Sequence, residues 1–400
     1  GPAGVPPARS GHGGGGPGTG AVGVAEALVP FLPGPLVELC RCSEEGCDCG
    51  CGKGEEAVSA PVPSPEPSPA AESGGAPEGF YDVPMQGNAR ILHITDVHGQ
   101  LKPVYFREPN VNLGVGDAYG RPQHIVGNKM VAHMGLKEGS IEEYAYTYLN
   151  FDKWAREYGR MGGFAHIKTL LDSLRESAGG RGNTLTVDGG DLWQGSGTSL
   201  WTRGVDMVEA SNILGIDVMV GHWEFTYKED EVLSNVALFK GDFIGQNVRV
   251  KEESLFGDEY PALVEKYDGR GLYDEDTGHA FQPYVIKEIN GVPTAIIGQA
   301  FPYTPIANPS RFIPDWTFGI RDADMQAVVD TVRENEKPDV VVVISHNGMD
   351  VDLKMASVVS GIDVIFGGHT HDGVPAPSIV KNKGGQTLVT NAGSNGKFLG

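Results

Sequence analysis

Residues 338–348 read PDVVVVISHNG, and residues 361–371 read GIDVIFGGHTH. Each stretch is a run of mainly β-branched, apolar residues that stops at a group of polar residues and glycines. A nearly continuous apolar run predicts a strand that is covered on both faces. The polar residues that follow each run lie in the loops where the strands end, and such loops commonly carry function. These two stretches therefore predict buried strands that end in candidate functional side chains.

The same pattern recurs along the chain from residue 89 onward. The other predicted strands lie in ARILHITDVHG (89–99), NTLTVDGGD (183–191), GIDVMVGHWEF (215–225), GDFIGQNV (241–248), PTAIIGQAF (293–301) and QTLVTNAGS (386–394). Between them, residues 162–177 and 322–336 have the apolar spacing of amphipathic helices. Strands that alternate with helices predict an α/β domain.

The first 80 residues have a different composition from the rest. They contain 18 of the 58 glycines, 13 of the 27 prolines and all five cysteines. The cysteines are odd in number, and their C-x-C spacing matches no standard zinc pattern. We predict a low-complexity, disordered tail and linker over residues 1–85 and a folded domain over residues 86–400. Metal or disulfide chemistry at the cysteines is the alternative.

Two further features concern the organisation of the folded domain. Residues 102–160 form an aromatic-rich insertion between the first two predicted strands, and it is long enough to cover or shape a site. The last predicted strand is followed by only a few residues, so we expect a further region beyond Gly400. No uninterrupted run of 18 apolar residues predicts a membrane span, and no signal peptide is recognisable.

The formal net charge of the chain is −21. Binding of nucleic acid requires clustered lysine and arginine, so this charge argues against a nucleic-acid partner. It also argues against an anionic membrane surface. An acidic protein can still bind an anionic substrate if metal ions supply the positive charge.

Five predicted strand ends carry side chains of the kinds that bind metals. In the D-x-H and H-x-H pairs, alternate residues of an extended chain point to the same side. The candidate ligands are Asp96, His98, Asp191, His222, His346, His369 and His371. Any one of them could be a structural residue without a metal. We interpret the following residues as structural: His93, His124, His133, His166, His279 and Asp188. The recurrence of the candidate ligands at five strand ends instead predicts a shared metal site.

The ordered series ITDVHG, VDGGD, VGHWE, ISHNG and GGHTH resembles the calcineurin-like metallophosphoesterase superfamily, in its 5′-nucleotidase branch. The resemblance covers residues 89–400. It implies a four-layer α/β/β/α sandwich with two divalent metal ions above the strand ends. It also implies a C-terminal domain of the 5′-nucleotidase type, which this chain would lack after Gly400.

The resemblance also assigns the candidate ligands to the two ions by position. The first ion would be held by Asp96, His98 and His371. The second ion would be held by His222, His346 and His369. Asp191 would bridge the ions and hold the attacking hydroxide. Mixed imidazole and carboxylate ligands suit manganese, zinc or iron without choosing among them.

One segment departs from the pattern of this branch. The branch has Gly-Asn-His-Glu-Phe-Asp where residues 221–226 read GHWEFT. His222 replaces a metal-binding asparagine, Trp223 replaces the histidine that assists the leaving group, and Thr226 replaces the aspartate that orients that histidine. Tryptophan has no proton that titrates near neutral pH, so this segment argues against an ordinary phosphomonoester mechanism.

GHWEFTY, together with residues 101–114 and 158–167, resembles the SoxB family, the thiosulfohydrolases of bacterial sulfur oxidation. This resemblance implies a periplasmic enzyme with two Mn²⁺ ions, and we expect the chain to be a monomer. Such an enzyme releases sulfate from a cysteine S-thiosulfonate on the SoxYZ carrier protein. A thiol-type leaving group has a lower pKa than an alkoxide, so the loss of the acid histidine becomes tolerable.

Four further residues are candidates for the catalytic site, each with a structural alternative. Arg160 is an anion contact or a surface arginine, and Asn347 is an anion contact or a turn former. Trp223 forms a wall of the site or packs, and Tyr227 lines the pocket or packs. Two other functions stay open: a 5′-nucleotidase or related phosphoesterase, and an inactive metal-containing binding module.

Overall fold

The computed structural model describes residues 79, 81–105, 120–121, 124–267 and 272–400. All of these residues fall in one of the two units into which the chain divides. The predicted tail, with its five cysteines, lies almost entirely outside the described residues and stays a prediction. Within the described residues, no helix is long and apolar enough to cross a membrane.

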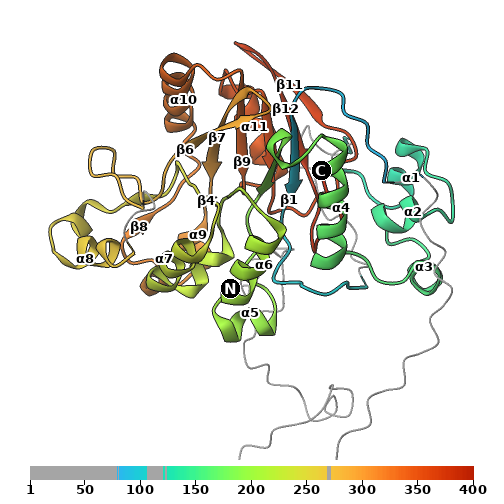
Figure 1. Ribbon diagram of the computed structural model, residues 1–400, viewed down its shortest axis with the longest axis horizontal. Helices are drawn as coiled ribbons and strands as arrows, with labels where there is room; N and C mark the ends of the chain where they lie inside the picture. Colours follow the sequence, from blue (N-terminus) through green and yellow to red (C-terminus); the bar gives the residue numbers. More distant parts are fainter. Residues whose placement is uncertain (1–78, 80, 106–119, 122–123, 268–271) are drawn as a thin grey trace, which may run out of the picture. The chain divides into compact units, whose positions relative to one another are not determined.

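Two β-sheets form the centre of the described unit (Figure 1). The first sheet is parallel throughout, in the order β1 (Arg90–Ile94), β2 (Thr184–Asp188), β3 (Val218–Met219) and β4 (Asp242–Phe243). The second has the order β11 (Ser378–Asn382), β12 (Gly385–Asn391), β10 (Val364–Gly367), β9 (Val340–Ser345), β7 (Val292–Gln299) and β6 (Tyr284–Ile289). Its four inner strands are parallel, and the edge strands β6 and β11 are antiparallel. A separate pair joins β5 (Arg249–Val250) to β8 (Trp316–Thr317).

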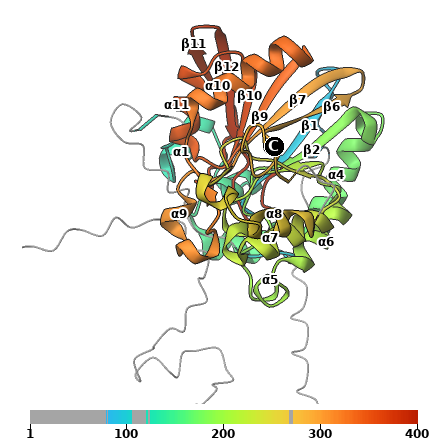
Figure 2. The same ribbon diagram turned by 90° about the vertical axis from the view of Figure 1, so that its left-hand side faces the viewer.

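Helices cover the outer face of each sheet. The outer helices are α4 (Phe164–Ser177), α6 (Val205–Leu214) and α7 (Glu229–Leu238) on the first sheet, and α10 (Asp322–Thr331) and α11 (Met349–Val358) on the second. Figure 2 shows both sheets between α10 and α11 on one side and α4 and α6 on the other. The shorter helices are α1 (Asn128–Met134), α2 (Ile141–Tyr146), α3 (Phe151–Tyr158), α5 (Gly197–Thr202), α8 (Glu259–Glu265) and α9 (Thr304–Ala307). The predicted helix over 322–336 is α10 followed by one π-helical turn, Val332–Glu336.

The alternation of side chains along β9 explains the layers. Val341 and Val343 pack in the core beneath α10 and α11, whereas Val342 and Ile344 pack between the two sheets. Successive residues of a strand point to opposite faces, so a continuous run of valines fills both cores. The predicted α/β/β/α sandwich is confirmed.

The described part of the aromatic insertion has a small core of its own. Tyr144 and Trp154 are buried in it, and Tyr158 packs against them. The insertion also reaches the loop beyond the last predicted ligand. Tyr146 stacks on Phe398 with ring centroids 4.8 Å apart, and both rings lie against Gly373.

Candidate metal centre

The parallel strands place all the candidate ligands at one edge of the two sheets, because the carboxyl ends of parallel strands lie on the same side. Asp96 and His98 follow β1, Asp191 follows β2, and His222 follows β3. From the second sheet, His346 follows β9, whereas His369 and His371 follow β10. The two sheets therefore contribute to one site from opposite sides.

Three of these residues form a first group of potential metal ligands. A ligand atom of Asp96, of His98 and of His371 lies within 4.8 Å of those of the other two. The Nε2 atoms of His98 and His371 are 3.0 Å apart, and the Nε2 atom of His371 is 3.3 Å from Oδ1 of Asp96. Two imidazoles and a carboxylate that converge in this way fit a divalent cation.

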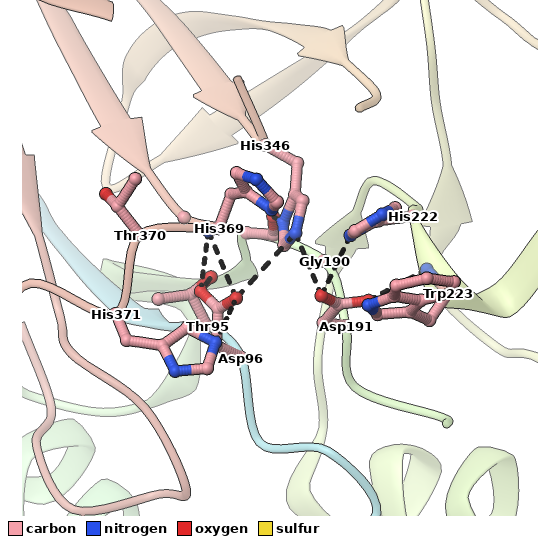
Figure 3. Close-up of polar contacts among 12 residues, drawn as sticks. Thr95, Asp96, Gly190, Asp191, His222, Trp223, His346, His369, Thr370 and His371 are labelled. Carbon is pink, nitrogen blue, oxygen red and sulfur yellow. Dashed lines mark hydrogen bonds and ion pairs between the residues drawn. The ribbon is translucent and has the colours of Figure 1, made fainter. Parts of the chain in front are cut away.

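The other four form a second group around Asp191. The ligand atoms of Asp191, His222, His346 and His369 also lie within 4.8 Å of one another. Oδ2 of Asp191 is 3.0 Å from Nδ1 of His222 and 3.0 Å from Nε2 of His346 (Figure 3). The same oxygen is 3.9 Å from Nε2 of His98 in the first group. Asp191 thus faces both groups, as a bridging ligand must.

The backbone at the ligands differs from the extended chain that the D-x-H and H-x-H spacing predicts. The φ angle is 52° at Asp96, 55° at His98, 57° at Asp191, 75° at His369 and 56° at His371. Left-handed backbone is unfavourable for residues other than glycine, and it persists at functional sites where the surroundings impose it. The prediction that alternation along an extended chain aims these pairs is wrong, because tight left-handed turns aim them.

Hydrogen bonds hold the ligand-bearing turns in place. The backbone N–H of His369 donates to both carboxylate oxygens of Asp96, at 3.0 and 2.9 Å. The hydroxyl of Thr95 donates to Oδ2 of Asp96 at 2.6 Å. The carbonyl of Gly189 lies 2.6 Å from Nδ1 of His346, which directs Nε2 of that ring toward Asp191. Such contacts fix the orientation of metal-binding side chains.

Glu224 is a functional residue to which the sequence analysis assigned no role. Its buried carboxylate accepts hydrogen bonds from the backbone N–H groups of Leu192, Trp193 and His222, at 2.8, 2.9 and 2.8 Å. Leu192 and Trp193 directly follow Asp191. One side chain therefore joins the turns that carry two of the ligands. The available signal in the sequence was an acidic residue two positions after the candidate ligand His222.

At His346 and Asp191, charged neighbours outweigh the effect of burial on the pKa. Burial opposes protonation of His346, but the carboxylates of Asp191 and Asp96 outweigh burial and raise its pKa to about 10. Burial also opposes ionisation of Asp191, but His222 and His346 outweigh it and hold the pKa of Asp191 well below its usual range. Divalent cations and protons compete for such atoms, so this donor set fits metal ions.

The family model of the calcineurin-like phosphoesterases matches residues 89–373. The chain belongs to this family. It is therefore a hydrolase of the metallophosphoesterase type, with histidine and aspartate clusters that could hold divalent metals.

Curated relatives of this phosphoesterase lie in the 5′-nucleotidase branch. Rat 5′-nucleotidase is 26% identical over 259 residues, which are 60% of this chain and 40% of the relative. Protein UshA of Yersinia enterocolitica is 26% identical over 276 residues, which are 62% of this chain and 46% of the relative. This chain thus spans less than half the length of either protein.

Two solved structures share the fold. The sulfate thiohydrolase SoxB of Thermus thermophilus, in complex with glycerol, superposes with a TM-score of 0.68 at 33% identity. That match covers 79% of this chain and 54% of the SoxB chain. A 5′-nucleotidase precursor from the same organism gives a TM-score of 0.53 at 22% identity, over 78% of this chain and 50% of that one.

Trp223 lies beside the second group of this phosphoesterase. Its backbone N–H donates to Oδ1 of Asp191 at 2.8 Å, and its half-buried ring stacks on His222 with centroids 4.6 Å apart (Figure 3). Thr226 donates its hydroxyl to the Trp223 carbonyl at 2.7 Å. At the position where the 5′-nucleotidase pattern has histidine, an indole thus borders the second group.

The side chains of Tyr227, Arg160 and Asn347 contact residues other than the candidate ligands. Tyr227 is buried in the core and donates its hydroxyl to the Trp193 carbonyl at 3.0 Å. Arg160 is exposed, with its guanidinium 5.2 Å from the Tyr105 ring. The amide of Asn347 is held in a buried network, with Oδ1 accepting from Gln299 at 3.0 Å. These contacts fit packing for Tyr227 and a structural role for Asn347, and a catalytic role for any of the three residues stays a prediction.

Asp188 and His93 are predicted to be structural residues, and their contacts in the structure agree with that prediction. Oδ1 of Asp188 accepts the backbone N–H of Gly190 at 2.8 Å, so this carboxylate caps the turn before Asp191. His93 is buried against Phe366, with ring centroids 5.0 Å apart, and belongs to neither ligand group.

Proposed function

We propose that this chain is the catalytic domain of a dimetal hydrolase that releases sulfate from a cysteine S-thiosulfonate on a SoxYZ-type carrier protein. The observation that carries the proposal is the indole of Trp223 beside Asp191 and His222. Indole cannot supply the proton that an alkoxide leaving group requires. The 33% identity to the SoxB structure supports the same substrate class.

The two ligand groups are the proposed metal sites, and Mn²⁺ is the proposed metal. Asp96, His98 and His371 would hold one ion, and His222, His346 and His369 the other, with Asp191 shared. Two adjacent divalent ions supply charge for substrate oxygens and a nucleophile at neutral pH.

The proposed reaction balances without a protein acid. The oxygen of water forms a bond to the sulfonate sulfur, and the S–S bond to that sulfur breaks. The carrier's sulfur leaves with the electron pair as a persulfide, sulfate is the second product, and the two protons of water pass to solvent. A persulfide is a much weaker base than an alkoxide, so its departure needs no protonation by residue 223.

Access to the site is consistent with a substrate carried on another protein. The side chain of His371 is 24% exposed, whereas that of Asp96 is fully buried, so the first group faces outward on the His371 side. Next to this side lie Gly373 and the Tyr146 ring of the insertion. We propose that the carrier's modified cysteine approaches past these residues, which would place the enzyme with its carrier in the periplasm.

The test is an assay of the metal-loaded, full-length chain on AMP and on a thiosulfonate-loaded carrier. We expect sulfate release and little hydrolysis of AMP. The second candidate, a 5′-nucleotidase, is favoured by the names of the curated relatives. It predicts robust AMP hydrolysis without sulfate release, and that result would refute the proposal. Bound metal without turnover of either substrate would instead indicate a binding module.

A further inference from the structure

The three histidines of the second group are held in different ways. Nδ1 of His346 lies 2.6 Å from the Gly189 carbonyl, so a backbone acceptor orients this ring. Nε2 of His222 is buried without a hydrogen-bond partner. In the described part of the chain, no hydrogen bond to a ring nitrogen of His369 is found. Metal-binding imidazoles are ordinarily oriented by a hydrogen bond from the other ring nitrogen, so another contact must orient these two rings.

The ring of Phe301 contacts both of these imidazoles. Its centroid is 4.0 Å from that of His222, at an interplanar angle of 42°. It is 4.2 Å from the centroid of His369, at 36°. His222 and His369 come from different sheets and meet at this site (Figure 3). A single phenyl ring therefore packs against two candidate ligands that come from different sheets and lie far apart in the sequence.

Two aromatic rings, those of Trp223 and Phe301, pack against the imidazole of His222. The Trp223 ring stacks on His222 at an interplanar angle of 29°, with centroids 4.6 Å apart. Phe301 is only 7% exposed, and the Tyr303 ring packs edge-on against it at 5.8 Å. The imidazole of His222 is thus flanked by two aromatic rings, which restrict its rotation.

The backbone around Phe301 fixes the ring relative to the ligand-bearing strands. The N–H of Phe301 donates to the Gly221 carbonyl at 3.1 Å, directly before His222. The Gln299 carbonyl accepts the N–H of His346 at 2.8 Å. Between them, Ala300 exchanges two hydrogen bonds with the Asn247 amide, at 2.8 and 2.7 Å. Residues 299–301 therefore join the chain after β3 to the chain after β9 through backbone hydrogen bonds.

From this geometry we infer that Phe301 is a positioning residue for the second metal ion, holding the His222 and His369 rings in place of an orienting hydrogen bond. The inference rests on the dinuclear site of the proposed function. Phe301 has no polar atom on its side chain and does not bind the ion itself. Leucine would fill much of the same volume but would offer no flat face to either imidazole.

The test is the affinity of the full-length chain for Mn²⁺, measured by titrating the metal-free Phe301→Leu protein with MnCl₂. Outer residues of this kind alter metal affinity by about 10- to 100-fold, so we expect one of the two Mn²⁺ sites to weaken about tenfold. The other site, at Asp96, His98 and His371, should keep its affinity. Phe301→Tyr retains the ring and should bind both ions as the parent chain does.

Phe281→Leu is the matched control. Phe281 is also buried, but its ring partners are Phe225, Phe243 and Trp316, with no metal ligand among them. We expect this variant to lose stability and to keep both Mn²⁺ affinities. If Phe301→Leu does not fold, Phe301→Met gives the same readout.

Unchanged Mn²⁺ affinity in Phe301→Leu, or in Phe301→Met if the leucine variant does not fold, would overturn the inference, as would equal weakening in the Phe281 control. A parent chain that binds fewer than two Mn²⁺ ions would overturn both the inference and the dinuclear site. A parent chain that binds two Mn²⁺ ions without releasing sulfate refutes only the proposed substrate. In that case the loss of affinity in Phe301→Leu still supports the inference.

Discussion

Replacing Glu224 with glutamine changes the buried group that connects the turns after β2 and β3. In the structure, Oε1 accepts the N–H groups of Leu192 and Trp193, and Oε2 accepts that of His222. A glutamine oxygen can keep the first two bonds. Its NH₂ group would then face the N–H of His222, so that two donors meet and that bond is lost.

The size of the effect follows from these three contacts. A hydrogen bond to a charged group contributes about 1.5–3 kcal/mol, and the two retained bonds lose their charge assistance. Burial raises the pKa of Glu224, which means that the buried carboxylate itself costs free energy that a neutral amide would not. We therefore expect the free energy of unfolding to fall by about 2 kcal/mol, the lower part of that range.

The assay is urea unfolding followed by tryptophan fluorescence, since Trp193 is fully buried next to Glu224. Glu231→Gln is the control, because Glu231 pairs at the surface with Arg203, whose side chain is 60% exposed. An exposed pair of this kind contributes up to about 1 kcal/mol. If Glu224→Gln and Glu231→Gln have the same free energy of unfolding, the structural role of Glu224 is refuted.

Three other predictions concern Asp191, Trp223 and a second buried glutamate, Glu229. Asp191→Ala removes the carboxylate that faces both ligand groups, so the manganese content by elemental analysis and the activity should fall together; an unchanged metal stoichiometry would contradict the bridging role. Trp223→His combined with Thr226→Asp restores the histidine and the aspartate of the 5′-nucleotidase pattern and should raise AMP hydrolysis at least tenfold, because general acid catalysis contributes about 10²- to 10⁴-fold, whereas an unchanged rate would count against the lost-acid explanation. Burial raises the pKa of Glu229 to about 8, so the folded chain keeps a proton that the unfolded chain loses near the ordinary pKa, and stability should fall as the pH rises toward 8 and then level off. Glu229→Gln should flatten that fall in thermal melts recorded across this pH window, and parallel curves for the two proteins would exclude Glu229 as the cause.

The strands and the positions of the ligands could be predicted because both depend on local sequence. The run VVVVIS fills two cores in any sheet that is covered on both faces, and a histidine at its end must lie at the sheet edge. The α/β/β/α arrangement of the two sheets then brings the ends of five strands together: β1, β2, β3, β9 and β10. The seven ligand candidates therefore meet in the structure as two adjacent groups.

The orientation of individual side chains could not be predicted, because it depends on contacts between distant segments. The left-handed backbone at Asp96 is imposed by its N–H bond to Gly190 and its side-chain bonds to His369. Likewise, Asn347 follows a ligand in sequence, but the buried amide of Gln299 holds its side chain within the core. Phe301 lies about 80 residues along the chain from His222, so only the packing of β7 beside the site reveals their contact.

The proposed reaction of this phosphoesterase is cleavage of an S–S bond at a sulfonate. The most direct measurement is a reaction of the manganese-loaded, full-length chain with a thiosulfonate-bearing carrier, in water labelled with heavy oxygen. We expect one labelled oxygen in each sulfate released, together with one carrier that has lost its sulfonate, as measured by mass spectrometry. A carrier that keeps its sulfonate while the same preparation rapidly hydrolyses AMP would contradict the proposed function.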